Sequence, residues 1–264
     1  MENKIAIPKG KKVFFASDNH LGAPNINESK IRESHFLKWL NYVDKEVGAL
    51  FLLGDLFDFW YEYKTVVPKG FVRVLGKIAE ISDRGIPVYF FVGNHDQWMI
   101  NYFEEELGIK VYYQTNEFQI EGKTFFIGHG DGLGPNDIGY KIMKKIFRNS
   151  FFQTMFRWIH PDIGMKLGHY FSVKNKIISG KRNEKLQKQE NNWLIDYAKM
   201  KNKVKKRDFF LFGHQHYPCD IKIDKESRYI NLGDWIDHYS YAAVSYTHLR
   251  AHETGRKLEC RLLL

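Results

Sequence analysis

Short apolar runs alternate with stretches of helical periodicity along most of the chain. Each run is long enough for one buried strand. The intervening segments Ser29–Val47 and Gly70–Arg84 carry apolar residues at helical spacing. Strands that alternate with helices in this way predict an α/β fold with a layered β-sandwich core flanked by helices. The predicted strands are Lys12–Ser17, Ala49–Leu53, Val88–Val92, Thr124–Ile127, Phe209–Phe212 and Arg228–Leu232.

Nearly every predicted strand is followed by a loop that contains glycine together with Asp, Asn or His. In open α/β sheets, ligands bind beyond the carboxyl ends of the strands. We therefore expect these loops, although distant in sequence, to meet at one edge of the core. The loops are Asp18-Asn19-His20, Gly54-Asp55, Gly93-Asn94-His95-Asp96, Gly128-His129-Gly130-Asp131, Gly213-His214-Gln215-His216 and Gly233-Asp234-Trp235.

Residues 136–190 break the strand–helix alternation. Apolar residues from Ile142 to Ile159 trace one helical face, with lysines and arginines between them. A second basic stretch, Lys174–Lys185, follows. We interpret this region as a helical cap inserted over the site within a single domain, 1–243. Two ordinary amphipathic helices of the core are the alternative interpretation.

Composition narrows the class of protein and of partner. The 264 residues, 44% hydrophobic and 16% aromatic, predict a globular domain with a substantial core. The formal charge of +9 indicates an anionic partner, or else only a soluble lysine-rich surface. Two cysteines, no signal peptide and no apolar stretch long enough to span a bilayer predict a cytoplasmic location.

The last segment, 244–264, differs in character from the rest. Its sequence from Val244 to Thr254 resembles the conceptual translation of a sequencing adapter, so we interpret residues 244–264 as a non-native tail. A natural short tail is the alternative. The first interpretation predicts that the chain after Ala243 does not continue the sheet, and it removes His248 and His252 from consideration as ligands.

The residue types in the strand-end loops suit divalent cations. Carboxylate and amide oxygens are ligands of hard cations, whereas imidazole suits borderline ions such as Mn²⁺, Fe²⁺ or Zn²⁺. A single such loop is weak evidence, because an Asp-x-His or a Gly-His-x-His occurs for structural reasons too. Five clusters in this order, each at a strand end, indicate a metal site.

At this point the loops resemble the motif set of calcineurin-like metallophosphoesterases, over about Val13 to Trp235. The resemblance implies two divalent metal ions, Mn²⁺ with Fe²⁺ or Zn²⁺ as alternatives, and a bridging Asp55 with one oxygen on each ion. Such a pair, about 3.5–4 Å apart, clamps a phosphoryl group and activates water. The implied ligands are Asp18, His20, Asp55 and His216 for one ion, and Asp55, Asn94, His129 and His214 for the other.

Other residues of the loops have expected supporting roles. His95 follows the ligand Asn94, so it can hydrogen-bond the phosphate or protonate the leaving oxygen as a catalytic residue. A structural loop residue is the alternative for His95. We interpret Asp58, Asp96 and Asp131 as carboxylates that orient imidazoles or staple the loops.

Three motifs and the basic insertion resemble the UDP-2,3-diacylglucosamine pyrophosphohydrolases of lipid A synthesis. The motifs are Gly54-Asp55-Leu56-Phe57-Asp58-Phe59-Trp60, His129-Gly130-Asp131 and Leu232-Gly233-Asp234-Trp235. That family hydrolyses UDP-2,3-diacylglucosamine to UMP and 2,3-diacylglucosamine 1-phosphate. Members often have Arg where this chain has His95, and the His form is similar to a Bacteroidetes-type branch. In the insertion, an apolar face is expected to cover the acyl chains. Four basic residues are expected to bind phosphate: Lys174, Lys176, Lys181 and Arg182.

The partner is therefore expected to be a lipid-linked nucleotide sugar, at the cytoplasmic face of the inner membrane, and nucleic acid is not expected. Two alternatives stay open. One is a metallophosphoesterase acting on another phosphoester: a nucleotide, a phosphoprotein or nucleic acid. The other is a non-catalytic module that retains the fold, although no implied ligand is missing.

Overall fold

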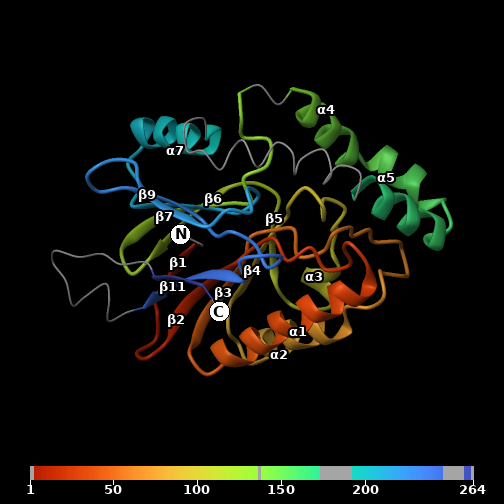
Figure 1. The fold of residues 1–264 in the computed structure, drawn as a ribbon, viewed down its shortest axis with the longest axis horizontal. Coiled ribbons are helices and arrows are strands. Elements are labelled where there is room, and N and C mark those ends of the chain that lie inside the picture. The colour runs from red at the N-terminus through yellow and green to blue at the C-terminus, as the bar shows by residue number, and fades with distance from the viewer. Residues whose placement is uncertain (1–2, 136–137, 173–191, 246–258, 263–264) are drawn as a thin grey trace.

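Two β-sheets packed face to face form the centre of the molecule. The computed structural model describes residues 3–135, 138–172, 192–245 and 259–262. Within these ranges each sheet has six strands, and helices lie on both outer surfaces (Figure 1). The layered α/β architecture predicted from the sequence is confirmed.

The first sheet has the strand order β12-β11-β2-β3-β4-β5. Strands β2 to β5 run parallel, and β11 pairs antiparallel with β2. Because β2, β3 and β4 are parallel, the loops that follow them leave the sheet at the same edge. The strands are β2 (Lys12–Ala16), β3 (Val47–Leu52), β4 (Val88–Phe91), β5 (Lys110–Tyr112), β11 (Ser240–Ser245) and β12 (Glu259–Leu262).

The second sheet has the order β1-β6-β7-β8-β10-β9. Here β7, β8 and β10 are parallel neighbours, so their loops also share one edge. The two antiparallel pairs are β6 with β7 and β9 with β10. The strands are β1 (Lys4–Ile5), β6 (Asn116–Ile120), β7 (Lys123–Ile127), β8 (Phe209–Phe212), β9 (Cys219–Lys222) and β10 (Arg228–Asn231).

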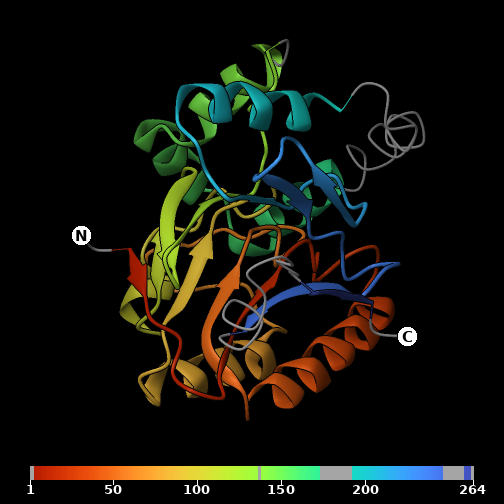
Figure 2. The same ribbon diagram turned by 90° about the vertical axis from the view of Figure 1, so that its left-hand side faces the viewer.

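Helices cover the outer face of each sheet, and Figures 1 and 2 show α1 and α7 on opposite sides of the molecule. Helix α1 (Ile26–Val43) begins earlier than its apolar periodicity predicts, because the Asn25 side chain caps it by accepting from two backbone N–H groups. Helix α2 (Val72–Asp83) lies beside α1, and a short helix, α3 (Tyr102–Glu105), precedes β5. Helix α7 (Trp193–Val204), which the sequence analysis missed, covers the second sheet.

The core has an apolar layer on each side of both sheets. Along β2, Val13 and Phe15 point into the layer between the sheets, while Phe14 and Ala16 point into the layer beneath α1 and α2. This is the two-residue period of a strand with both faces buried. It explains why the strand sequences are continuous apolar runs instead of alternating ones.

The expectation that the chain after Ala243 leaves the sheet is wrong. Val244 and Ser245 belong to β11, where Val244 is buried and pairs with Val13. Strand β12 then pairs with β11, with Ala243 opposite Glu259. Strand β11 pairs with β2 along one edge only, so its other edge has backbone groups that can pair with another strand. The non-native origin of residues 244–264 stays a prediction, and 246–258 lie outside the described residues.

The predicted insertion consists of separate helices: α4 (Ile138–Phe147), α5 (Ser150–Arg157) and a helical stretch over 161–172. The break between α4 and α5 lies at Asn149, whose side chain accepts from Phe151 N and starts the second helix. No residue of α5 is buried, and Phe151 is 64% exposed. Helix α5 still contacts buried aromatic residues of the loops, since the ring centroid of Phe156 lies 4.7 Å from that of Tyr61 and 4.5 Å from that of Trp98. Figure 1 shows α4 and α5 outside the two sheet layers, and their interpretation as a cap over the site stays a prediction. We call α4, α5 and 161–172 the cap.

Candidate metal centre

The seven predicted metal ligands all lie in loops that follow parallel strands, and the structure brings these loops together. Asp18 and His20 follow β2, Asp55 follows β3, and Asn94 follows β4. From the second sheet, His129 follows β7, and the pair His214 and His216 follows β8. Backbone hydrogen bonds join the loops, including His20 N to Asp55 O at 2.8 Å and Gly213 N to His129 O at 2.9 Å.

The backbone at this cluster is strained. Five of the predicted ligands have φ between 45° and 68°, in the left-handed region that non-glycine residues rarely adopt: Asp18, His20, Asp55, His214 and His216. Each such residue costs about 1–3 kcal/mol, and strain of this kind concentrates at functional sites. The surrounding loops must therefore hold these side chains in place against a local preference.

Glycine is required where two of the loops cross. A Cβ on Gly93 would lie 2.2 Å from Asp55 Oδ1 and 2.6 Å from the Asp55 backbone nitrogen. Gly54 has φ +86°, and a Cβ there would lie 2.7 Å from both Gly93 N and His129 Nδ1. The two glycines allow the β3 and β4 loops to approach closely enough to share one cluster.

Asp55 lies at the centre of the cluster. Its Oδ2 atom is 3.6 Å from His20 Nε2 and 3.4 Å from His129 Nε2, so this one oxygen lies between imidazoles of both sheets. Its Oδ1 atom accepts a hydrogen bond of 2.8 Å from the His95 backbone N–H. Oδ2 therefore faces imidazoles of both predicted ion sites, and the bridging of two ions by Asp55, with one oxygen on each, stays a prediction.

The first predicted ion site has closely spaced donors. His216 Nε2 lies 3.2 Å from His20 Nε2 and 3.4 Å from Asp18 Oδ1. Asp18 Oδ2 accepts from the backbone of His214, whereas the buried Oδ1 has no hydrogen-bond partner among the described residues. Two ligands about 2.1 Å from one cation at tetrahedral angles are about 3.4 Å apart. The spacing and the unsatisfied carboxylate oxygen both fit a divalent cation.

The second predicted site is built around His129. Its Nε2 lies 3.2 Å from Asn94 Oδ1 and 3.4 Å from Asp55 Oδ2. The ring of His214 lies edge-on to that of His129, with centroids 5.2 Å apart. The carboxylate, amide and imidazole donors of this second group also suit a divalent ion of borderline character.

Acceptors behind two of the imidazoles fix their orientation, and a carboxylate lies beside a third. His129 Nδ1 is 2.7 Å from Leu53 O, and His216 Nδ1 is 3.2 Å from Asp234 Oδ2. His20 Nδ1 lies 3.4 Å from Asp58 Oδ1. A neutral imidazole that donates from Nδ1 presents the Nε2 lone pair to the cluster, as a metal ligand requires.

The three predicted supporting carboxylates differ in what they contact. Asp58 is beside His20, as expected. Asp96 instead accepts from the backbone N–H groups of Gly93 (2.6 Å) and Leu56 (3.0 Å), so it joins the β3 and β4 loops. Asp131 accepts from Tyr140 of the cap at 2.5 Å. Asp234, in a strand-end motif noted in the sequence, has the imidazole-orienting role that the sequence analysis did not give it.

The electrostatics of the cluster favour added positive charge. Burial opposes charging of His129, but Asp55, Asp18 and Asp131 outweigh it and raise the pKa of this imidazole to about 10. Burial and repulsion from His129 lower the pKa of His214 to about 3. Burial and the charge of Asp55 raise the pKa of Asp96 to about 8. A bound divalent cation supplies the charge that the carboxylates otherwise draw from a proton.

His95 lies on the open side of the cluster. Its ring is edge-on to that of His20, with centroids 4.7 Å apart, and a ring nitrogen lies within 4.8 Å of donor atoms of His20 and Asp55. Its Nδ1 is 2.9 Å from Asp58 O, so Nδ1 carries a proton and the other nitrogen is available to a ligand.

The cap reaches this cluster through residues that sequence reasoning missed. Ser172 Oγ donates to Asp58 Oδ2 at 2.7 Å and lies 3.0 Å from His95 Nδ1. His169 Nδ1, one helical turn earlier, lies 3.6 Å from Asp58 Oδ2. No motif marks Ser172, and only its place in the inserted helix could have drawn attention to it. The predicted phosphate-binding residues lie outside the described residues: Lys174, Lys176, Lys181 and Arg182.

Comparisons with known proteins agree with this geometry. The sequence profile of the family described as calcineurin-like phosphoesterase matches residues 11–218. A Porphyromonas gingivalis protein named UDP-2,3-diacylglucosamine hydrolase is 36% identical over 251 residues, which cover 90% of this chain and 95% of that protein. A Yersinia pestis protein of the same name is 27% identical over 225 residues, 84% of this chain and 90% of its own.

Among solved structures, Yfce, a phosphoesterase from E. coli, matches with a TM-score of 0.43 and 15% identity. The match covers 89% of this chain and 88% of that one.

Proposed function

Since this chain belongs to the calcineurin-like phosphoesterase family, we propose that it hydrolyses the pyrophosphate bond of UDP-2,3-diacylglucosamine. The products are UMP and 2,3-diacylglucosamine 1-phosphate, in the synthesis of lipid A. The P. gingivalis relative is named for this activity, and the match covers nearly its whole length. The observation that carries the proposal is a carboxylate–imidazole cluster, centred on Asp55, directly beneath a cap with exposed apolar side chains.

We assign two divalent cations to the cluster, with Mn²⁺ as the expected metal. Asp18, His20, Asp55 and His216 would hold one cation, and Asp55, Asn94, His129 and His214 would hold the other. When bound, the pair supplies Lewis acidity that activates water and neutralises charge on the phosphoryl oxygens. The observed donor spacing of 3.2–3.8 Å around Asp18, His20 and His216 supports this assignment.

The remaining chemistry comes from side chains at the mouth of the cluster. His95 is held through Nδ1 by the Asp58 carbonyl and by the Ser172 hydroxyl, which leaves its outer nitrogen facing the substrate. In the charged form, this nitrogen donates to a phosphoryl oxygen or gives its proton to the leaving oxygen. We therefore propose His95 as the catalytic residue of the site.

The cap supplies the surface for the lipid half of the substrate. Side chains that are more than half exposed include Phe151 (64%), Met155 (56%), Ile163 (55%) and Phe171 (58%). An acyl chain that covers such side chains gains about 0.8 kcal/mol for each buried CH₂. Exposed apolar surface of this extent is typical of a binding site and is costly otherwise.

The basic residues and the apolar cap also favour binding of the protein to a membrane surface. No helix among the described residues has the length and apolar character of a membrane span. The diacylated substrate resides in a bilayer, and lysines beside an apolar helical face are attracted to anionic lipid. We propose peripheral binding at the cytoplasmic face of the inner membrane, with Lys174, Lys176, Lys181 and Arg182 contacting substrate phosphate.

The test is a hydrolysis assay in Mn²⁺ that compares UDP-2,3-diacylglucosamine with an aryl phosphodiester, bis(p-nitrophenyl) phosphate. We expect a higher kcat/KM for the lipid-linked substrate, with UMP as a product identified by mass spectrometry. A higher kcat/KM for the aryl ester would leave a phosphoesterase of another substrate class and would refute the lipid A assignment.

A further inference from the structure

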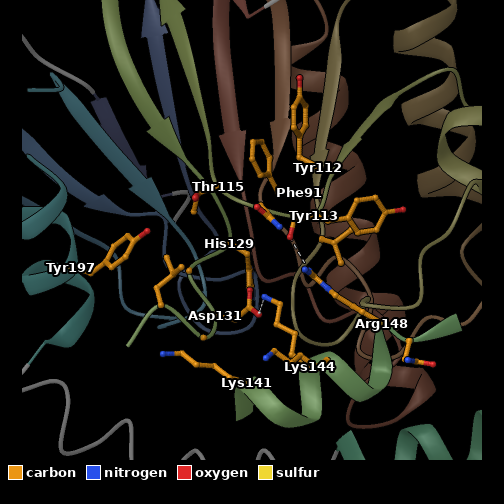
Figure 3. Close-up of a pocket in the computed structure, with 17 residues that line it drawn as sticks. Phe91, Tyr112, Tyr113, Thr115, His129, Asp131, Lys141, Lys144, Arg148 and Tyr197 are labelled. Carbon is orange, nitrogen blue, oxygen red and sulfur yellow. Dashed lines mark hydrogen bonds and ion pairs between the residues drawn. The ribbon is translucent and has the colours of Figure 1, made fainter. Parts of the chain in front are cut away.

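A basic cavity of about 780 Å³ lies next to the metal centre, on the side where His129 and Asp131 form part of its wall (Figure 3). Ligand cavities are typically about 300–1,000 Å³. The opposite wall is α4 with Arg148, which directly follows it, and the loop after β5 closes a third side. The cavity therefore joins the reacting centre to a space large enough for half of the substrate.

The charge of this cavity suits an anion. Four basic side chains line it, Lys141, Lys144, Lys145 and Arg148, against the single carboxylate of Asp131. Figure 3 shows Lys144 pointing from α4 toward Asp131, and Arg148 pointing toward Tyr113. Lys144 is ion-paired with Asp131, so the charges of the other three basic side chains are not balanced by a carboxylate of the cavity lining.

The side chain of Arg148 is held in place, but one of its hydrogen-bond donors has no acceptor among the described residues. It donates from its terminal nitrogen to Tyr113 O at 2.8 Å and lies 5.9 Å from the centre of the Tyr113 ring. Its Nε atom is buried and has no hydrogen-bond partner among the described residues. A buried donor without an acceptor is unfavourable, so an acceptor on a ligand would stabilise this position.

The aromatic wall of the cavity adjoins the basic residues, since Arg148 contacts Tyr113. Tyr113 is 38% exposed, whereas Phe91 and Tyr112, which stack with ring centroids 5.0 Å apart, are 1% and 9% exposed and belong mainly to the core. Flat aromatic rings next to cationic side chains are typical of sites that hold a nucleobase and its phosphate.

The same cavity is poorly suited to the acyl half of the substrate. None of the exposed apolar residues of α5 or of 161–172 lines it. Those side chains, such as Phe151 and Phe171, belong to other parts of the cap. The two kinds of surface near the metal centre are therefore separate, one apolar and one both basic and aromatic.

We propose that this cavity binds the nucleoside monophosphate half of the substrate, with its phosphate toward His129 and its base toward the aromatic wall. The inference rests on the proposed function, because only that function identifies the bound nucleoside monophosphate as UMP. It divides the substrate at the metal centre: the nucleotide lies between α4 and the β5 loop, and the acyl chains lie on the apolar part of the cap. Lys141 and Lys145 then determine affinity for the nucleotide product.

The test is direct binding to the full-length, Mn²⁺-loaded chain by isothermal titration calorimetry. The probes are UMP, inorganic phosphate and N-acetylglucosamine 1-phosphate. The variants are Lys145→Ala and Lys141→Ala, and Lys199→Ala is the matched control, an exposed lysine of α7 that does not line the cavity. We expect each cavity variant to raise the Kd of UMP about five- to tenfold and that of inorganic phosphate by a smaller factor, because only UMP extends from the metal centre into the cavity, with the control unchanged.

Three results would overturn the assignment. In the first, UMP affinity is unchanged in both cavity variants. In the second, UMP and phosphate weaken equally, which would mean that the lysines act only on charge at the metal centre. In the third, N-acetylglucosamine 1-phosphate weakens in place of UMP, which would put the other half of the substrate here. Because binding is measured without turnover, failure to hydrolyse UDP-2,3-diacylglucosamine would refute the proposed function separately.

Discussion

The hydroxyl of Ser172 lies 3.0 Å from Nδ1 of His95, although 77 residues separate them in sequence. Ser172 belongs to the cap and is 6% exposed, while His95 belongs to the loop after β4. The same hydroxyl donates to Asp58 Oδ2. This contact connects the position of the cap to the orientation of the proposed catalytic imidazole.

Ser172→Ala is therefore expected to lower kcat about three- to tenfold while KM changes little, since about 1 kcal/mol of positioning is lost. Ser172→Thr keeps the hydroxyl and should restore most of the rate. Steady-state kinetics on UDP-2,3-diacylglucosamine measures both. Ser150→Ala, at the exposed start of α5, is the control, and an equal loss in that variant would assign the effect to the cap in general.

Removal of single imidazoles tests the metal assignment. His129→Ala and His214→Ala are each expected to lower kcat/KM more than about 100-fold and to reduce bound metal, because each removes a proposed ligand. The far-UV circular dichroism should stay that of the parent. His160→Ala is the matched control, since the side chain of His160 is 68% exposed and distant from the cluster in sequence. Full activity in either cluster variant would contradict the assigned roles.

Metal removal should destabilise the protein as well as inactivate it. Without cations, Asp18 and Asp55 are buried carboxylates in a shared cluster, and metal binds only the folded arrangement. Dialysis against a chelator is expected to lower Tm, and added Mn²⁺ is expected to restore it. Calorimetric titration of the stripped chain should give two cations per chain, and a stoichiometry of one would contradict the bridging role of Asp55.

Substitution of Gly93, the glycine at the loop crossing, is expected to change stability in the opposite direction to the same substitution at a glycine with free space around it. Gly93→Ala puts a Cβ 2.2 Å from Asp55 Oδ1, so either the β3 or the β4 loop must move. We expect a loss of stability of at least about 2 kcal/mol and loss of metal affinity. Gly76→Ala, in α2 with nothing within 4 Å of the added Cβ, should instead stabilise the protein by about 0.5–1 kcal/mol. Urea denaturation separates the two outcomes.

A group of ion pairs around Glu117, far from the metal centre, makes a pH-dependent contribution to the free energy of unfolding. Burial disfavours the ionised form of Glu117, but Lys205 and Arg207 outweigh it and lower the pKa of this carboxyl. A lowered folded-state pKa means that the stabilisation is complete above the unfolded-state value, about 4.3, and is lost as the pH falls further. Glu117→Gln should therefore lower the free energy of unfolding by up to about 1 kcal/mol at pH 7.

At pH 3 the difference between Glu117→Gln and the parent should shrink, because pH 3 lies below the unfolded-state pKa and part of the stabilisation by the ionised carboxyl is lost there. Urea denaturation at the two pH values measures this. Glu226→Gln, at an exposed position, is the control that should change little at either pH. A difference for Glu117→Gln that is the same at both pH values would show that the ion pair is not its cause.

Local sequence patterns are enough to predict which residues form the central strands and which ligand types their loops carry. Strand β8 coincides with its predicted range, Phe209–Phe212, because both of its faces are buried and its apolar run is continuous. Elements with weaker periodicity escaped prediction, among them β9, whose residues are mostly half-buried, and α7. Helix ends shifted too, since capping by Asn25 decides where α1 begins.

How the side chains meet depends instead on the packing of the whole fold. The strand-end loops identified Asp55 and His129, but the crossing at Gly93 puts one oxygen of Asp55 between His20 and His129. The contact of Ser172 with His95 and the basic cavity beside α4 depend on where the cap packs, which no local pattern encodes. Local sequence determines backbone preference and donor type, whereas distances between loops depend on strand order and on packing across the two sheets.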